Sequence, residues 1–228
     1  MGKGKLYGVS VGPGDPELIT LKAIKTIEQA DVVATPNIGH KRQTAYTIAE
    51  KYLEGKELLD CSTPMTKDRT VAVKAYERIA DDLCACLEAG KSVAYLCLGD
   101  IGVYSTYIYI HDLVVARGYE AEIIPGVTSF SAAAAKLGIA LCEGPERLIV
   151  APAMASDIDE ILDMPANKVF MKPGKSIGML RDKLAERDQL EQASMVVNCG
   201  LDDERVYPSF ADIDDGTDYF SIVIVKDV

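Results

Sequence analysis

The sequence predicts an α/β fold, and three observations lead to that prediction. Short apolar runs alternate with longer segments of helical periodicity along the whole chain. Glycine-containing turns follow several of these runs, at points where a strand would pass into a helix. The chain has 228 residues, 48% of them hydrophobic, which is enough for a sizeable core. Two α/β sub-domains of ordinary size are therefore expected, residues 1–138 and residues 139–228.

The first sub-domain is expected to alternate strands with helices. The expected strands are residues 5–11, 31–35, 56–60, 92–98 and 120–124. The expected helices are residues 18–30, 44–53, 71–89, 104–116 and 132–137. Helical spacing of Leu21, Ile24 and Ile27 supports the first helix, and Asp15 before Pro16 is a natural N-cap.

The second sub-domain repeats this pattern after a linker at residues 138–146. The expected strands are residues 147–152, 168–172, 194–199 and 219–226, and the expected helices are residues 157–164 and 176–187. The last strand alternates little, which is typical of a strand buried on both faces. Acidic loops are expected around residues 202–204 and 212–218.

The turn Gly99-Asp100-Ile101-Gly102 follows a buried strand and precedes an apolar helix. In open α/β sheets, small ligands bind beyond the carboxyl ends of strands, so this turn is a candidate binding loop. Asp100 could equally serve as the N-cap of the following helix. Two further glycine turns, at residues 12–14 and 125–131, end other strands in the same way. The spacing of Gly8, Gly12 and Gly14 fits neither a dinucleotide fingerprint nor a P-loop.

Composition excludes several classes of function. A net charge of −11 argues against a sequence-independent grip on nucleic acid, including that of ribosomal RNA methylases. No apolar stretch is long enough for a membrane span, and the N-terminus lacks a signal-peptide pattern, so a cytosolic protein is expected. The six cysteines form no CxxC pair and there are only two histidines, so reduced thiols and no metal site are expected.

Four stretches, taken in chain order, together resemble one family. They are LYGVSVGPGDPELITLKA near the start, YLCLGDIGVYST in the middle, AEIIPGVTSFSAAAA after it and YFSIVIVK at the end. The combination resembles the tetrapyrrole methyltransferases, which transfer a methyl group from S-adenosylmethionine to corrin or siroheme precursors. It is most similar to the precorrin-2 or cobalt-factor II C(20)-methyltransferases, through GDPELITLKA, DVVATP and FSAAAAKLGI.

The resemblance implies two α/β domains with the active-site cleft between them, S-adenosyl-L-methionine as methyl donor, and a homodimer. Matched by position, the implied donor-binding residues are Pro13, Gly99, Asp100, Ile101, Val103, Thr128, Ser129, Met171, Gly200 and Ser221, with Cys199 and Ile222 as further candidates. The substrate class carries many carboxylates. The expected substrate-binding residues are Lys41, Arg42, Lys67, Arg69 and Tyr104, and Arg147, Lys172, Lys175 and Arg205 are further cations in loops or at strand ends.

No side chain stands out as a general base. Asp100, Tyr104 and His40 are candidates without a known geometry, and the electron-rich tetrapyrrole can supply its own nucleophile. Alternatives within the fold are methylation at C-11, C-17 or in the siroheme branch, and a protein methylation like that of diphthine synthase. Alternatives of other classes are a nicotinamide-dependent oxidoreductase and a non-catalytic binding module. The oxidoreductase requires an acidic residue ending the second strand, where this chain has Ala34-Thr35-Pro36.

Overall fold

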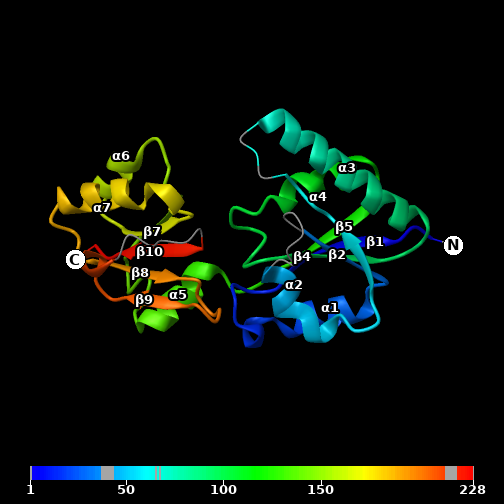
Figure 1. The fold of residues 1–228 in the computed structure, drawn as a ribbon, viewed down its shortest axis with the longest axis horizontal. Helices are drawn as coiled ribbons and strands as arrows, with labels where there is room; N and C mark the ends of the chain where they lie inside the picture. The colour runs from blue at the N-terminus through cyan, green and yellow to red at the C-terminus, as the bar shows by residue number, and fades with distance from the viewer. Residues whose placement is uncertain (1, 37–43, 65, 67, 214–219, 228) are drawn as a thin grey trace. The chain divides into compact units, whose positions relative to one another are not determined.

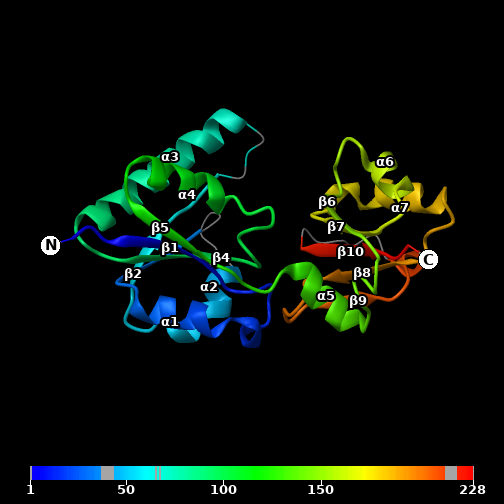
Figure 2. The same ribbon diagram turned by 180° about the vertical axis from the view of Figure 1, so that it is seen from behind.

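The computed structural model describes residues 2–36, 44–64, 66, 68–213 and 220–227. The chain divides into two compact units, residues 1–128 and residues 129–228. Each unit is a sheet with helices, so the predicted α/β class is confirmed (Figures 1 and 2). None of the helices in the described ranges is both long and apolar enough to span a lipid bilayer.

The first unit contains a parallel sheet with the strand order β3-β2-β4-β1-β5. The strands are β1 (Lys5–Ser10), β2 (Val32–Thr35), β3 (Glu57–Asp60), β4 (Val93–Cys97) and β5 (Glu120–Ile124). Since all five run in one direction, the loops that follow them leave from the same edge of the sheet. The adjacent strands β4, β1 and β5 carry the three glycine turns, so the topology brings these turns together.

Helices cover both faces of this sheet. They are α1 (Leu21–Gln29), α2 (Thr44–Ala49), α3 (Arg69–Glu88) and α4 (Tyr107–Ala116), with short 3-10 turns at Pro16–Leu18 and Glu50–Tyr52. In β4, Val93, Tyr95 and Cys97 pack in the core beneath α3 and α4. The alternate residues Ala94 and Leu96 pack with α1 and α2 on the other face. The period of two along a strand explains this division, and Figure 1 shows the two helix layers on either side of the strands.

The second unit contains a mixed sheet with the strand order β6-β7-β10-β8-β9. Its strands are β6 (Leu148–Pro152), β7 (Asn167–Met171), β8 (Ala193–Val197), β9 (Arg205–Tyr207) and β10 (Ser221–Val225). Its helices are α5 (Ser129–Leu137), α6 (Ile158–Asp163) and α7 (Ile177–Ala185). Short 3-10 turns lie at Gly174–Ser176 and Phe210–Asp212. The side chains of α6 and α7 share one core with the sheet, whereas α5 packs against β8 and β10. Every residue of β10 is buried, which confirms the prediction for the last strand.

Three local expectations differ from the structure. The apolar helix predicted from residue 104 begins at Tyr107, because Tyr104 has a φ of +52°, which an α-helix cannot contain. Asp100 is therefore not its N-cap, and Thr106 occupies that position. The three-residue strand β9, paired antiparallel with β8 at the sheet edge, was not predicted, because it is too short to show a period. The boundary between the units also falls earlier than the predicted 138/139, since α5 packs with the second sheet.

Candidate functional site

Two of the glycine turns in the first unit are bonded directly to each other. Gly12, after β1, and Gly99, after β4, form an isolated antiparallel bridge. The N–H of Gly99 donates to the oxygen of Gly12 over 2.7 Å, and the N–H of Gly12 donates to Gly99 over 3.3 Å. Both glycines adopt positive φ, +82° and +71°, which a residue with a Cβ adopts only at a cost. Backbone groups of Gly12 and Gly99 therefore hold the ends of β1 and β4 together at this edge of the sheet.

The Asp100 carboxylate joins the second of these turns to the third. Its Oδ1 accepts the N–H of Gly102 over 2.8 Å, which closes the local turn. Its Oδ2 accepts the N–H of Gly126, in the turn after β5, also over 2.8 Å. Both carboxylate oxygens are thus engaged by backbone N–H groups of the protein. Asp100 therefore holds the two loops together.

Gly126 is a position where the backbone needs the absence of a side chain. A Cβ placed there would lie 2.6 Å from the Cβ of Ser10 and 2.9 Å from the oxygen of Gly99. Ser10 is fully buried, and its Oγ accepts the N–H of Ile101 over 3.0 Å. The ends of β1, β4 and β5 are therefore packed closely and hydrogen-bonded to one another. Neither Ser10 nor Gly126 was singled out from the sequence, because a serine at the end of a strand and a glycine in a turn are common.

The other predicted residues of the first unit occupy the same loops. Pro13 and Ile101 are buried, and Val103 and Thr128 are half-buried. Tyr104 is exposed on the loop that carries Asp100. Arg69 is the exposed first residue of α3, and its loop leaves the sheet from β3 at the same edge. The predicted residues His40, Lys41, Arg42 and Lys67 lie outside the described residues.

The predicted residues of the second unit come together at one edge of its sheet. Met171 ends β7 and pairs with Ile222 of β10, and Ser221, the first residue of β10, pairs with Val197, which ends β8. Met171 and Ser221 are buried. Gly200 follows β8 by a short turn, and the N–H of Asn198 in that turn donates to the oxygen of Phe220 over 3.0 Å. Three segments that are distant in sequence thus meet at this edge.

Strained backbone marks the same edge. Lys172, directly after β7, and Asn198, directly after β8, have φ values of +55° and +51°. Such conformations are uncommon for residues other than glycine and concentrate at functional sites. Burial lowers the pKa of Lys172 below its usual value. Arg205, at the start of β9, pairs with Val197 and lies at this edge as well.

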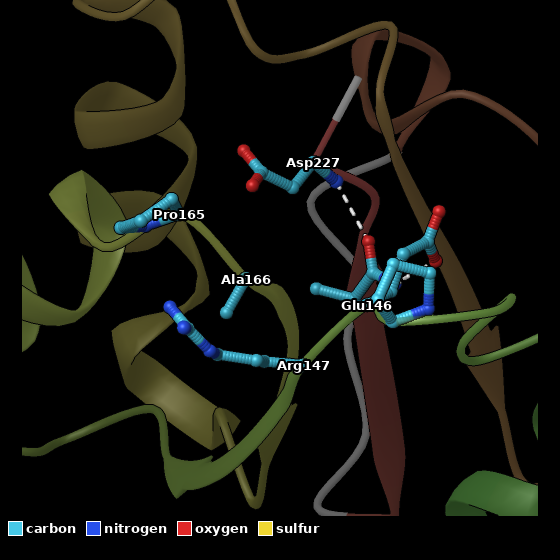
Figure 3. A pocket seen from close by; sticks show the side chains of 7 residues that line it. Glu146, Arg147, Pro165, Ala166 and Asp227 are labelled. Atoms are coloured by element: carbon cyan, nitrogen blue, oxygen red, sulfur yellow. Dashed lines mark hydrogen bonds between the residues drawn. The ribbon is translucent and has the colours of Figure 1, made fainter.

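A small pocket lies at the opposite edge of the second sheet. It has a volume of about 150 Å³ and is lined by residues 145–147, residues 165–167 and Asp227 (Figure 3). Asn167 accepts the N–H of Asp227 over 2.8 Å and donates to the Glu146 carboxylate over 2.7 Å, so these groups tie the linker to β7. Arg147 lines this pocket. It therefore lies at the edge of the sheet opposite to Lys172 and Arg205. The lining of the pocket does not include the predicted donor-binding residues.

Comparison with known proteins identifies the family. The family model of the Tetrapyrrole (Corrin/Porphyrin) Methylases matches residues 5–213. The chain belongs to this family. Among curated tetrapyrrole methylases, a probable cobalt-precorrin-2 C(20)-methyltransferase of Methanocaldococcus jannaschii is 33% identical, over 97% of this chain and 96% of its own length. The cobalt-precorrin-2 C(20)-methyltransferase of Salmonella typhimurium is 32% identical, over 98% and 96%.

Solved structures of tetrapyrrole methylases share the fold. A cobalt precorrin-4 methyltransferase superposes with a TM-score of 0.78 at 22% identity, covering 97% of this chain and 94% of its own. A uroporphyrin-III C-methyltransferase from Thermus thermophilus, complexed with S-adenyl homocysteine, gives a TM-score of 0.74 at 22% identity, covering 98% of each chain. These likenesses confirm the predicted fold family.

Proposed function

We propose that this protein transfers a methyl group from S-adenosyl-L-methionine to carbon 20 of precorrin-2 or of its cobalt-containing form. The observation that carries the proposal is the similarity, over nearly the full length, to relatives named for this reaction. A relative named for the metal-free substrate supports the same reaction. It is a precorrin-2 C(20)-methyltransferase of Sinorhizobium, which is 32% identical over 99% of this chain. The clustering of the glycine turns within the first unit supports the same function.

The donor-binding residues form two groups, one in each unit. In the first unit they are Pro13, Gly99, Asp100, Ile101, Val103 and Thr128, and in the second they are Ser129, Met171, Gly200 and Ser221. Backbone atoms dominate the first group, because three of its loops contain glycine and the Asp100 carboxylate is already bonded. Donor affinity in the first unit therefore depends on loop conformation more than on any one side chain.

Methyl transfer from a sulfonium to a carbon nucleophile is an in-line displacement. The carbon–sulfur bond of the donor breaks as the new carbon–carbon bond forms, and the donor leaves as neutral S-adenosylhomocysteine. The tetrapyrrole takes on the positive charge and loses it by releasing a proton to solvent. The tetrapyrrole supplies the electron pair, so the protein has to hold two molecules at attack distance and exclude water. Positioning of this kind lowers a barrier by about 7–11 kcal/mol in favourable cases.

Cations recognise the carboxylates of the tetrapyrrole. The net charge of −11 opposes a polyanionic substrate at long range, but charges beyond a Debye length of about 8 Å are screened at physiological salt. Local groups therefore decide binding. Arg69, Lys172 and Arg205 are described cations at the two candidate edges, and Lys41, Arg42 and Lys67 are proposed to act with them.

Labelled methyl transfer tests the function directly. The purified protein is incubated with S-adenosylmethionine carrying a ¹³C methyl group and with either metal-free or cobalt-loaded precorrin-2. The expected result is one new methyl resonance at carbon 20 in at least one arm, together with S-adenosylhomocysteine. A methyl group at another carbon, or donor binding without transfer, would contradict the proposed reaction.

The protein is further proposed to act as a cytoplasmic homodimer. All six cysteines are free thiols, which suits a reducing compartment. Helix α4 is apolar on nearly all sides, a pattern expected of a buried helix. Yet Tyr109, Val115 and Ile108 are 56%, 46% and 36% exposed, and Tyr109 stacks on Tyr76 of α3 at 5.7 Å. A second copy is proposed to cover this face.

Light scattering after size exclusion measures the oligomeric state. Val115→Glu places a charge on the apolar face of α4 and is expected to shift the protein from dimer to monomer. Leu21→Glu is the matched control, because Leu21 is 75% exposed on α1, away from this face. A wild-type monomer, or a dimer that survives Val115→Glu, would contradict the proposed interface.

A further inference from the structure

The acidic segment Asp203-Glu204 bonds back to the turn that precedes it. The Asn198 side-chain amide donates to Oδ2 of Asp203 over 2.7 Å. The backbone N–H of Gly200 donates to Oε2 of Glu204 over 2.6 Å. The two residues held in this way, Asn198 and Gly200, both have positive φ, +51° and +80°. Two consecutive carboxylates thus hold the two left-handed residues of one turn.

Glu204 is the more enclosed of the two carboxylates. Its side chain is 20% exposed, and its Oε1 forms an ion pair of 3.0 Å with Nζ of Lys136, in the last turn of α5. The Cys199 thiol also hydrogen-bonds to it. Burial raises the pKa of Glu204, but the Gly200 N–H and the Lys136 ammonium outweigh burial and leave the pKa below its usual value. Glu204 is therefore ionised at neutral pH, and it links α5 to the turn.

We infer that Glu204 is a positioning residue for donor binding at the Gly200 turn, and that Lys136 fixes Glu204 in place. The inference rests on the proposed function, in which Gly200 contacts the donor. A turn that binds through its backbone offers no side chain to keep its shape, so another group must hold it. The charge-assisted bond from Gly200 to Glu204 supplies that restraint. Gly200 has no Cβ and would otherwise sample many conformations.

Donor affinity and thermal stability, measured together, test this role. Glu204→Ala removes the acceptor of the Gly200 N–H, and the dissociation constant for S-adenosylhomocysteine, by isothermal titration calorimetry, is expected to rise about tenfold or more. Glu204→Gln keeps an oxygen acceptor for Gly200 and loses the ion pair, so it is expected to lie within about threefold of wild type. Asp202→Ala is the matched control, because Asp202 lies exposed in the same acidic loop, and no change is expected.

If Glu204→Ala fails to fold, the variant Lys136→Met tests the role of Glu204 independently. It leaves the carboxylate bonded to Gly200 but removes its anchor on α5, and a rise of about threefold in the dissociation constant is expected. Its effect should not add to that of Glu204→Gln, since both variants remove the same ion pair.

The outcomes separate this inference from the proposed function. A wild-type protein that binds no donor would overturn the proposed function, and this inference with it. Wild-type binding with unchanged affinity in Glu204→Ala and Lys136→Met would overturn this inference alone. A lower melting temperature with unchanged donor affinity would likewise assign Glu204 a merely structural role and overturn it.

Discussion

The Oγ of Ser10 accepts a hydrogen bond of 3.0 Å from the backbone N–H of Ile101, and both groups are buried. Ser10 ends β1 and Ile101 lies in the loop after β4, so the bond joins the ends of two adjacent strands. A buried N–H without a partner is costly, because water cannot replace the lost acceptor. The hydroxyl of Ser10 therefore stabilises the conformation of the loop that contains Asp100.

Ser10→Ala is expected to lower the free energy of unfolding by about 1–3 kcal/mol, the cost of leaving one buried donor unsatisfied. Urea denaturation measures this change. Ser156→Ala, at an exposed turn position, is the control, with an expected change within about 0.5 kcal/mol. Donor affinity should fall in Ser10→Ala as well, because the Ile101 loop loses its anchor. Equal stability of the two variants would contradict the role given to this bond.

Gly126→Ala tests how tightly the three strand ends are packed. The added Cβ would lie 2.6 Å from Ser10 Cβ and 2.9 Å from the Gly99 oxygen, and neither neighbour can rotate away. Backbone would have to shift, and overpacking of this kind costs about 1–3 kcal/mol. The change is read from the urea midpoint and from donor affinity, and both are expected to fall.

Gly178→Ala is the matched substitution. Gly178 lies in α7, and nothing is within 4 Å of the Cβ that would be added. Alanine favours a helix over glycine by up to about 1 kcal/mol, so this variant is expected to be as stable as wild type or more stable. If Gly126→Ala were as stable as Gly178→Ala, the close approach at Gly126 would not contribute to stability.

Much of the fold could be predicted because the decisive signals are local. Apolar runs and helical spacing placed β5 at Glu120–Ile124 and a helix near Thr44 as the structure has them. The glycines at residues 99 and 102, directly after a buried strand, predict the turn at residues 99–102. The wrong prediction of the start of α4 also has a local cause. The helix begins late because Tyr104 has a left-handed backbone conformation, which the residue type does not predict.

The site could be predicted only in part, because its contacts are long-range. The family resemblance implies Gly200 and Ser221, whereas Gly99 and Asp100 are also expected from their turn after a buried strand, and the structure brings all four to strand ends within their units. The bonds that hold those residues, from Ile101 to Ser10 and from Gly126 to Asp100, join positions 91 and 26 residues apart. Periodicity and spacing carry no information about such pairs. For the same reason, the sequence identifies Glu204 only as part of an acidic loop.

Glu122 is expected to make stability depend on acid pH. Hydrogen bonds from Lys22 and Lys5, over 2.7 and 2.9 Å, lower the pKa of Glu122 from 4.5 to about 2. A carboxylate whose folded-state pKa is lowered stabilises the protein above its unfolded value, and that stability is lost as pH falls toward the folded value. Wild type should therefore melt at a higher temperature than Glu122→Gln at pH 7.

The difference in melting temperature should shrink as pH falls from about 4.5 to about 2, the two pKa values of Glu122. Added salt should reduce it at pH 7, because these charges are accessible to ions. Scanning calorimetry across this range measures both effects. A difference that stays constant down to pH 2 would show that the loss in Glu122→Gln has another origin.

Lys168 presents the opposite case, a cation that the fold destabilises. The residue is 1% exposed in β7. Burial lowers its pKa from 10.5, although Asp227 and Asp163 act against that shift. A lysine with a lowered folded-state pKa reduces stability at neutral pH, and this effect disappears as pH rises toward the unfolded value. Lys168→Met keeps a long flexible side chain without the charge, and it is expected to raise the melting temperature at pH 7.

The gain from Lys168→Met should decrease as pH approaches 10.5, the unfolded value for Lys168. Lys175→Met is the matched control, because Lys175 is exposed in the 3-10 turn after β7, and little change is expected at any pH. A loss of stability in Lys168→Met at neutral pH would mean that the attraction to Asp227 and Asp163 outweighs burial.

Catalysis is expected to depend on no single side chain. Asp100 is bonded through both oxygens to backbone N–H groups, and Tyr104 lies exposed on the same loop, so neither is placed as a buried base. Alanine variants of both, and of His40, are expected to lower kcat by less than about 10⁴-fold, since general bases contribute about 10²–10⁴-fold and positioning supplies the larger part. Single-turnover kinetics at saturating donor separates the chemical step from binding. One variant that loses more than this factor with donor affinity intact would identify a catalytic side chain and contradict a mechanism of positioning alone.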